Sequence, residues 1–460
     1  MDTIRLSPEV EQMAQQLDSI QLPTASPEQE ENSPEDSSES KINVIPESPE
    51  PKIALGMIVK NEEKVIIKTL QTVVDAVDCI FIYDTGSTDN TISLIKDFEK
   101  KISPKKIYML HGEFINFEVT RNELLKFIDN HHASQNVDFV LLLDANDEFH
   151  GTAELREFAR DRLTRPDDDE GGFYIEQRWL YGEVIDKYFN IFFIRPRMGW
   201  KYYGVVHEYI GPKDIHLAKT PQKCPPSIYI YQDRNENCEQ SFIRYNRDYK
   251  MLLEELKKNP TDPRTLFYLG QTCDCLELYN EAFFYYKRRV MLGRETEKGF
   301  VGFPEEVYHA HYRLGNLCIR LGKLHDEITE NYGNAMEFWN RVEPMMRLCE
   351  YYLFVRNQPL VAYGFASMAL FARYPSEALL FTSDTDYTYR RYNRFMVSAN
   401  LVGDFIRAYE IGQQMVDLGI AQESDVANLK IVKENLELAR EGKPISFRPP
   451  TKVNDNNLLI

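Results

Sequence analysis

Four apolar runs alternate with amphipathic segments between residues 52 and 145, and this alternation restricts the possible folds more than any other feature of the chain. The runs read KIALGMIV, CIFIYD, KKIYMLHG and DFVLLLDA, and segments with helical spacing of apolar residues separate them. Continuously apolar strands joined by helices predict a parallel sheet covered on both faces. Ligands of such sheets bind at the carboxyl ends of the strands. Asp84 and Asp144 lie at these ends.

The later part of the chain changes character twice. Strand-like segments between residues 172 and 231 are aromatic and irregular, and from about residue 236 to about 440 the pattern is helical. Within the helical part, Gly270 precedes Ala282 by twelve residues and Tyr286 follows four later. This is the spacing of a tetratricopeptide helical hairpin. The pattern restarts at YRLGNL, where we expect Ala335 and Trp339 to complete it after an insertion, and PLVAYGFASMALFARYP is a candidate third unit.

We therefore predict an α/β fold with a mixed sheet flanked by helices, followed by an all-α repeat domain. The expected boundaries are an acidic tail at 1–50, the α/β domain at 51–235, the helical domain at 236–445 and a C-terminal tail at 446–460. The tail at 1–50 is rich in Ser, Pro and Glu and is expected to be disordered. It carries twelve acidic residues against Arg5 and Lys41, so −10 of the chain's net charge of −18 lies there.

Composition excludes several classes of protein. The remaining body is only mildly acidic, which argues against nucleic-acid binding, because that needs a basic stripe. Seven scattered cysteines do not form a disulfide pattern, and the Cys273–Cys275 pair lacks partners for a zinc site. No apolar run approaches the ~20 residues of a membrane helix, and no signal peptide precedes the body. We expect a soluble, cytoplasmic protein, located in the host cytoplasm if it is viral.

Two loops at the expected carboxyl edge carry candidate binding residues. MIVKNEE contains Asn61 and Glu62, and YDTGSTDNT begins with Asp84 and opens a helix. A carboxylate at a strand end can accept hydrogen bonds from a ribose or a base, and unpaired N–H groups lie at a helix start. The alternative is that Asp84 only caps a turn.

A cluster of acids follows the fourth apolar run, in VLLLDANDEFHG. Three carboxylates within five residues are costly to place together unless a cation neutralises them, and a divalent ion bound to a diphosphate would do so. A solvated acidic loop is the alternative. His207, in GVVHEYI, could add a nitrogen ligand, although a lone histidine is usually structural. Arg121 in FEVTRNELL could face phosphate from a helix start, or it could pair with Glu118 or Glu123 on the surface.

Taken as an ordered set, these motifs resemble family 2 glycosyltransferases of the GT-A fold. The set consists of MIVKNEE, DTGSTDNT, FEVTRN, LLLDANDE and WKYYGVVHE, followed by the helical LFYLGQ…YNEAFFYYKRRV. The resemblance covers roughly residues 52–340. It is greatest to the branch, found in bacteria and large DNA viruses, that carries an appended tetratricopeptide-like domain.

The resemblance implies a nucleotide-sugar donor, UDP-linked, and Mn²⁺ or Mg²⁺ as cofactor. It also implies inversion of the anomeric centre in one displacement. Carried across, Asn61, Glu62 and Asp84 would hold the base and ribose, and Arg121 would lie near the nucleotide. The metal ligands implied by the family are Asp144, Asp147 and His207.

The acidic motif departs from the family pattern. The family usually has Asp-x-Asp, whereas this chain has Asp144-Ala145-Asn146-Asp147. Alternation along a strand would place Asn146, not Asp147, on the side of Asp144. Asp147 can serve only if the chain turns after Asp144. We favour Asp147 because a second negative charge binds a dication better than an amide oxygen, and Asn146 stays an alternative.

For the reaction we expect a base that removes the acceptor's proton while the donor's diphosphate leaves. Glu208 is the first candidate for this base, and Asp186 and Glu183 are rivals in YGEVIDKYFN. Aromatic residues could stack on sugar faces or belong to the core: Trp179, Tyr181, Trp200 and Tyr203. The expected acceptor is a protein, a peptide or a glycan, and the repeats could also bind a protein partner or a second copy of the chain.

Two other functions remain compatible with the sequence. A degenerate transferase domain could act as a binding module while the repeats recruit a partner. A nucleotidyltransferase would also use acids and a metal, but GMIVKNEEK is a poor version of the glycine-rich basic loop that is typical of that class.

Overall fold

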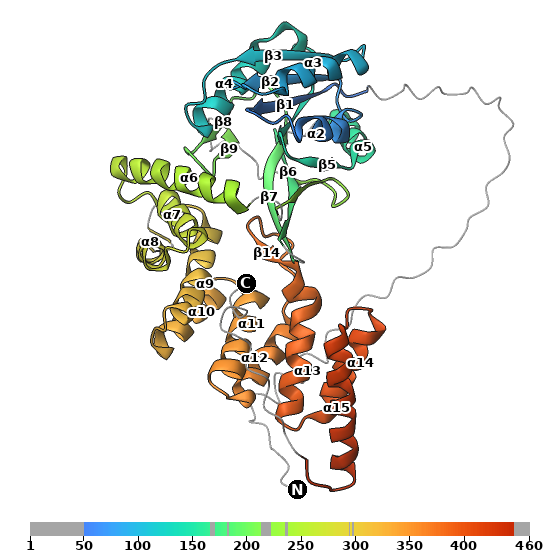
Figure 1. The fold of residues 1–460 in the computed structure, drawn as a ribbon, viewed down its shortest axis with the longest axis vertical. Helices are drawn as coiled ribbons and strands as arrows, with labels where there is room; N and C mark the ends of the chain where they lie inside the picture. Colours follow the sequence, from blue (N-terminus) through green and yellow to red (C-terminus); the bar gives the residue numbers. More distant parts are fainter. Residues whose placement is uncertain are drawn as a thin grey trace, which may run out of the picture. The chain divides into compact units, whose positions relative to one another are not determined.

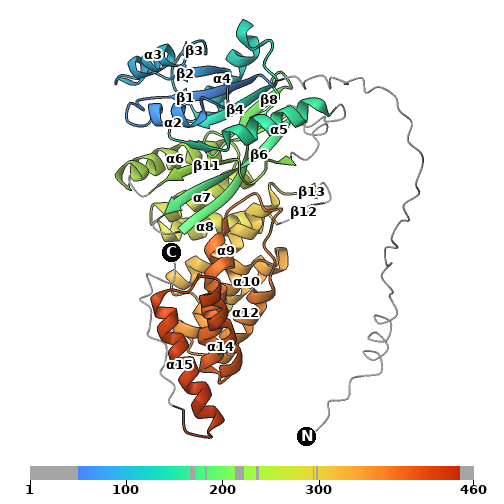
Figure 2. The same cartoon turned by 90° about the vertical axis from the view of Figure 1, so that its right-hand side faces the viewer.

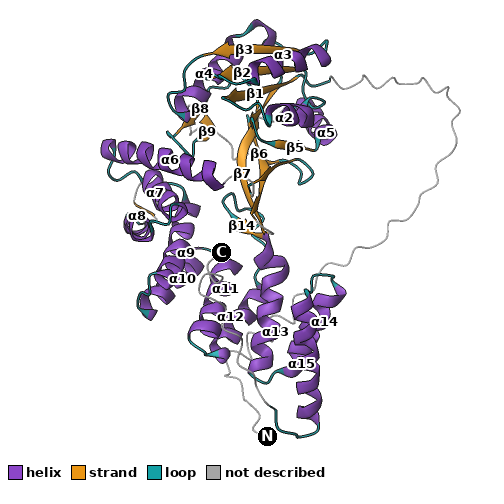
Figure 3. Ribbon diagram, in the orientation of Figure 1, coloured by secondary structure: helices purple, strands orange, loops and turns teal. Residues whose placement is uncertain are grey.

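The structure is a computed structural model that describes residues 50–165, 171–181, 184–212, 222–234, 238–293, 295–296 and 299–445. The described chain begins with α/β structure and continues as a series of helices, as Figure 3 shows by colour. Apart from Glu50, the predicted tails at 1–50 and 446–460 lie outside the described residues. No helix of the described segments is long and apolar enough to cross a membrane.

Four parallel strands form the first half of the sheet, as their sequence predicts. In the sheet they stand in the order β3-β2-β1-β4. Their bounds are β1 Ile53–Val59, β2 Cys79–Asp84, β3 Lys106–His111 and β4 Phe139–Asp144. β1, β2 and β4 are buried and apolar because helices cover both faces of the sheet there (Figure 1), whereas β3, at the end of the sheet, is half-buried. On one side α2 (Ile66–Val73), α3 (Thr91–Lys101) and α5 (Thr152–Thr164) share a core with β1, and α4 (Phe117–Asn130) packs on the other side.

The second half of the sheet is built by the aromatic segments. β7 joins β4 in antiparallel orientation, and the order continues as β6-β11-β5. The bounds are β5 Glu148–His150, β6 Gly172–Tyr181, β7 Val184–Ile194 and β11 Tyr229–Asp233, with β10 Gln222–Lys223 beside β6. A separate hairpin consists of β8 (Trp200–Tyr203) and β9 (Tyr209–Pro212). The mixed sheet that the sequence predicts is therefore confirmed.

The rest of the described chain is mainly a succession of helices that pack on their neighbours in sequence, as Figure 1 and Figure 2 show. The α-helices are α6 Cys238–Lys258, α7 Pro263–Cys275, α8 Tyr279–Met291, α9 Pro304–Arg320, α10 His325–Phe338, α11 Val342–Glu350, α12 Pro359–Phe371, α13 Arg391–Leu401, α14 Phe405–Asp417 and α15 Glu423–Arg440. Shorter elements are η1 His132–Ser134, η3 Tyr351–Val355, η4 Asp386–Arg390, β12 Glu295–Thr296 and β13 Gly299–Phe300. The predicted boundary at 235–236 falls between β11 and α6.

Glycine–tyrosine contacts hold the first two helical hairpins together. A Cβ on Gly270 would lie 2.7 Å from the Tyr286 ring, and one on Gly315 would lie 2.6 Å from the Tyr332 ring. The first contact confirms the spacing that the sequence indicates. In the second hairpin the expectation was wrong, because Trp339 follows the end of α10 and the partner of Gly315 is Tyr332.

A segment between α12 and η4 returns from the helices to the sheet. We call residues 374–384 the strap. It contains β14 (Thr382–Ser383), which pairs antiparallel with β7 at Lys187 and Asp186. The carboxylate of Glu305 on α9 accepts hydrogen bonds from the backbone N–H groups of Leu379 and Leu380. One sheet therefore includes strands from both predicted domains.

Candidate functional site

The carboxyl ends of the parallel strands meet at one edge of the sheet. In register, Val59 pairs with Asp84, Asp84 with His111, and Ile58 with Asp144. The predicted placement of Asp84 and Asp144 at this edge is thus confirmed by the topology.

Hydrogen bonds join the loop after β1 to the loop after β2. Asn61 lies in the left-handed region with φ 56°, which asparagine tolerates better than most residues. Its Oδ1 accepts from the N–H of Thr88 at 2.7 Å, and the N–H of Glu62 donates to Oγ1 of Thr91 at 2.8 Å. The first helical turn of α3 is thereby fixed against the Asn61–Glu62 turn.

Asp84 is buried and makes the contacts of a turn cap. Its Oδ1 accepts from the N–H of Ser87 at 3.0 Å, and its Oδ2 lies 3.1 Å from Nδ1 of His111. Burial acts to raise the pKa of Asp84, but the hydrogen bonds from Ser87 and His111 outweigh it and lower the pKa below its usual value. Asp84 is therefore a carboxylate, with both oxygens engaged within the protein.

Arg121 connects the sheet edge to the loop before β9. Its Nη2 donates to Oδ1 of Asp144 at 2.6 Å, and its Nε donates to Oε1 of Glu208. The guanidinium also lies over the Tyr202 ring, 5.3 Å from its centroid. Arg121 does not form the surface ion pair with Glu118 or Glu123 that the sequence left as an alternative. Its side chain is only 11% exposed, and its partners are Asp144 and Glu208. Arg121, Asp144 and Glu208 form a single charged group.

The chain turns directly after Asp144, as Asp147 would require for a role in the site. The N–H of Asp147 donates to the carbonyl of Asp144 at 3.1 Å. The Asp147 carboxylate, however, points inward and is fully buried. Its Oδ2 accepts from the N–H of Asp144 at 2.7 Å, and its Oδ1 accepts from the side-chain amides of Gln177 and Gln232. Asn146 is the exposed residue of the turn.

Negative charge exceeds positive charge at this edge. Burial, together with the charges of Asp144 and Asp89, raises the pKa of Glu62 to about 7. Burial likewise raises the pKa of Asp147 to about 7, with the charge of Asp144 as the second cause. A cation bound at this edge would stabilise the ionised form of these carboxylates.

His207 lies in the loop between β8 and β9, in contact with the first repeat. Its ring stacks on Tyr268 of α7, with centroids 4.2 Å apart and planes 10° apart. Burial lowers the pKa of His207 to about 3, and the charges of Arg264, Arg244 and Arg234 act in the same direction. The imidazole is therefore neutral at physiological pH, which a metal ligand requires.

Asp186 lies on the same face of the second half of the sheet as Gln232, which holds Asp147. In register, Asp186 on β7 pairs with Trp179 on β6, which pairs with Gln232 on β11. Asp186 thus stays on the face that carries Gln232, next to β14, and burial raises its pKa. Glu183 lies outside the described residues, as does the side chain of Tyr181.

The other aromatic candidates have structural contacts. Trp179 lies 4.6 Å from the Tyr188 ring and 6.0 Å from the Phe381 ring of the strap, and Arg234 covers it at 3.9 Å. Trp200 donates from Nε1 to the Arg195 carbonyl at 3.0 Å. Tyr203 stacks on Tyr209.

Several residues that build the site were not identified from the sequence. Gln177 and Gln232 hold Asp147, His111 pairs with Asp84, and Arg264 holds the His207 loop. Their partners are tens of residues away in the chain, so no local spacing marks them. The position of His111 at the end of an apolar strand is the one signal that could have been read.

The predicted metal ligands agree with this geometry only in part. Asp144 is 44% exposed on its side chain, and its second oxygen makes no recorded hydrogen bond to the described residues. Asp147 is enclosed. Within the part of the chain that the structure describes, no group of three or more His, Cys, Asp or Glu side chains is arranged to hold an ion. The second oxygen of Asp144 and the side-chain oxygen of the exposed Asn146, which also accepts from Nε2 of Gln232 at 3.3 Å, are donors of the kind that a hard divalent cation prefers.

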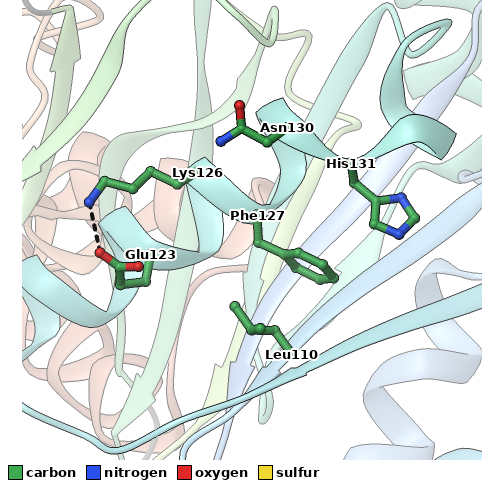
Figure 4. Close-up of a pocket in the computed structure, with 6 residues that line it drawn as sticks. All are labelled: Leu110, Glu123, Lys126, Phe127, Asn130 and His131. Carbon is green, nitrogen blue, oxygen red and sulfur yellow. Dashed lines mark hydrogen bonds and ion pairs between the residues drawn. The ribbon is translucent and has the colours of Figure 1, made fainter.

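A surface hollow of about 410 Å³ lies elsewhere, beside α4 and the end of β3 (Figure 4). Its lining residues are Leu110, Glu123, Lys126, Phe127, Asn130 and His131. It contains none of the site candidates, and its ion pair, Lys126–Glu123, is an exposed pair on one helix. We therefore place the functional site at the strand edge.

Comparison with known proteins gives a family for part of the chain. Residues 55–168 match the family described as glycosyl transferase family 2. The SPbeta prophage-derived glycosyltransferase SunS of Bacillus subtilis (strain 168) is 26% identical over 247 residues, which are 52% of this chain and 53% of SunS. The SunS glycosyltransferase of Bacillus phage SPbeta gives the same values. The chain spans about half the length of the curated relatives that it matches.

Solved structures are similar at lower levels. The mannosyltransferase PcManGT from Pyrobaculum calidifontis, in complex with GDP-Man and Mn²⁺, is 13% identical, with 64% of this chain and 88% of that chain covered and a TM-score of 0.32. The thermophilic tetratricopeptide protein TTC0263 of Thermus thermophilus is 15% identical, with 43% and 94% covered and a TM-score of 0.26.

Proposed function

We propose that this chain, whose residues 55–168 match the family described as glycosyl transferase family 2, transfers a sugar from a nucleotide donor to a protein or glycan acceptor with inversion. The observation that carries the proposal is the charged group at the strand edge. Arg121 links Asp144, at the end of β4, to Glu208, which lies just before β9. These contacts support the proposal, because they bring together two acids, of which Asp144 would face a leaving diphosphate and Glu208 would accept a proton.

The donor side of the site is assigned to the two joined loops. Asn61 and Glu62 lie on one loop and Asp84 begins the other, at the edge where parallel sheets bind ligands. We propose a UDP-linked sugar as donor, with its base and ribose against these loops. Arg121 lies at the second turn of α4 and would face the nucleotide.

A divalent ion, Mn²⁺ or Mg²⁺, would be held by Asp144, and the excess of negative charge around Glu62 favours its binding. The bound ion would supply charge neutralisation for the leaving diphosphate. Asp147 would then not bind the ion directly. It would hold the turn that presents Asp144, because its carboxylate accepts from the N–H of Asp144. His207 and Asn146 stay candidates for further ligands.

Glu208 would accept the proton of the acceptor's nucleophile as it attacks the anomeric carbon. Its ion pair with Arg121 holds the carboxylate in one orientation. Asp186 is the second candidate. It shares a sheet face with Trp179 and Tyr188, next to the strap, where we place the acceptor.

The test is nucleotide release from a panel of UDP- and GDP-linked sugars by the full chain, with Mn²⁺, with Mg²⁺ and with EDTA. We expect release with at least one UDP-sugar, its loss in EDTA, and a decrease of at least about 100-fold in Asp144→Asn and in Glu208→Gln. Release that EDTA leaves unchanged would contradict the metal dependence. Calorimetric binding of a donor without any turnover would favour the alternative of a binding module.

A further inference from the structure

We propose that Arg264, on the first helix of the repeats, is a positioning residue that fixes the loop carrying Glu208. This loop, residues 204–208, joins β8 to β9. Arg264 belongs to the helical part of the chain and does not itself touch the reacting groups. The expected effect of Arg264 on catalysis rests on the function proposed above.

Four groups surround the Arg264 guanidinium. Nη2 donates to the carbonyl of His207 at 2.7 Å, and Nη1 donates to Oε1 of Glu306 at 2.7 Å. The rings of Tyr209 and Tyr268 lie 4.8 and 4.7 Å from its carbon. A planar fork that donates in two directions while it contacts two aromatic rings is a geometry that lysine cannot reproduce. The side chain is therefore held in one orientation, with one donor directed at the loop.

The loop is also packed into the first repeat by its side chains. Val206 is buried in the apolar cluster of Leu252, Phe267 and Leu269, which lie on α6 and α7. The His207 ring stacks on Tyr268. On its other side, the carbonyl of Val205 accepts from the N–H of Phe117, at the start of α4. The loop is thus fixed between the helix that carries Arg121 and the helix that carries Arg264.

His207 needs this support because of its backbone conformation. Its φ is 50°, in the left-handed region that residues with a Cβ rarely adopt. Glu208 follows directly and reaches Arg121, which reaches Asp144. A continuous series of contacts therefore runs from Arg264 through the loop to the sheet edge.

The chain offers a matched control for Arg264. Arg289 on α8 is also an arginine of the first hairpin, and its charge also acts on the buried Glu306; Arg289 is fully buried, whereas the Arg264 side chain is 25% exposed. It donates to the carbonyl of Val301 at 2.8 Å, and among the described residues it has no recorded bond to the 204–208 loop. Loss of either arginine removes one cation near Glu306, but only Arg264 is bonded to the loop.

The experiment is amide hydrogen exchange on the full chain for the wild type, Arg264→Met and Arg289→Met. We expect Arg264→Met to raise exchange at least about tenfold in peptides that cover residues 204–209, and we expect Arg289→Met to leave those peptides at the wild-type rate. An unchanged rate in Arg264→Met would overturn the inference. An equal rise in both variants would also overturn it, because the cause would then be general destabilisation of the hairpin. If Arg264→Met does not fold, Arg264→Lys, which keeps the charge but loses the fork that donates in two directions, is measured in its place, and an unchanged rate at residues 204–209 would again overturn the inference.

Nucleotide release separates this inference from the proposed function. We expect Arg264→Met to lower kcat at least about tenfold with the donor KM within about twofold, because the described donor loops after β1 and β2 have no recorded contact with Arg264. Arg264→Lys should restore part of kcat through one hydrogen bond. A wild-type chain that releases no nucleotide would contradict the function and leave the exchange result standing. Full activity in Arg264→Met would contradict the inference alone.

Discussion

At the scale of single residues, Arg121 is the group on which the site's charges depend. Its side chain and that of Glu208 are 11% and 13% exposed. Removing one partner of a buried ion pair leaves the other charges without compensation.

We therefore expect Arg121→Met to lower the free energy of unfolding by about 3 kcal/mol and nucleotide release by at least about 100-fold. Urea unfolding and the release assay measure the two effects. The control is Lys126→Met on the same helix, whose exposed pair with Glu123 should contribute less than about 1 kcal/mol. Equal effects of the two substitutions on stability and on nucleotide release would contradict a particular role for Arg121.

Glu62 gives the metal-free protein a predicted pH dependence. Its pKa is raised from 4.5 to about 7, so the folded state keeps the proton that the unfolded state releases. The free energy of unfolding should therefore fall as the pH rises from 4.5 to about 7.

In EDTA, Glu62→Gln should raise the free energy of unfolding by about 1–2 kcal/mol at a pH of about 8, a figure reduced for partial exposure, and should change it little at a pH of about 4. Urea unfolding at the two pH values tests this. A variant with the same pH dependence as the wild type would contradict it.

How far the sequence predicts the site differs from one residue to the next. Asp84 and Asp144 could be placed because an apolar strand has a recognisable end. The inward turn of Asp147 could not, because it depends on Gln177 and Gln232, which are 30 and 85 residues distant. The sequence therefore locates the edge of the site better than the orientation of its side chains.

At the scale of elements, the helical hairpins depend on close contact between a glycine and a tyrosine. We expect Gly315→Ala to cost about 1–3 kcal/mol, because its Cβ would lie 2.6 Å from the Tyr332 ring. Gly333→Ala on α10 is the control, since nothing lies within 4 Å of its added Cβ. It should raise stability by about 0.5–1 kcal/mol. Thermal or urea unfolding measures the stability of both variants. If both substitutions raised the stability, or both lowered it, the result would contradict the packing described.

Elements also differ in how visible they are in the sequence. The long apolar strands and periodic helices were predicted with ends close to those observed, as with CIFIYD and β2. β14 was missed because two residues have no periodicity. Its existence depends on β7 as a partner, which lies far earlier in the chain.

At the scale of the whole molecule, the proposed domain boundary separates parts that share contacts. Lys223 beside β6 donates to the carbonyls of Ser376 and Ala378 in the strap, at 2.6 and 2.8 Å. Arg264 donates to His207 across the same boundary. Each of these polar groups would lose its partner if the chain were cut.

We therefore expect a fragment of residues 51–235 to be insoluble or to lack cooperative unfolding, whereas a fragment of residues 51–445 should unfold cooperatively. Circular dichroism during urea titration compares the two. A stable 51–235 fragment that binds the donor as the longer fragment does would contradict this prediction.

The strap has a consequence for synthesis on the ribosome. Its strand is made 188 residues after β7 ends, counted from Ile194 to Thr382. At roughly 5–20 residues per second, that interval lasts about 10–40 s. During this time the strand edge at Asp186 and Lys187 lacks its β14 neighbour and can pair with another nascent chain. The edge of β7 is therefore completed only after the strap has been synthesised, and a cell that makes this protein quickly has to shield that edge until then.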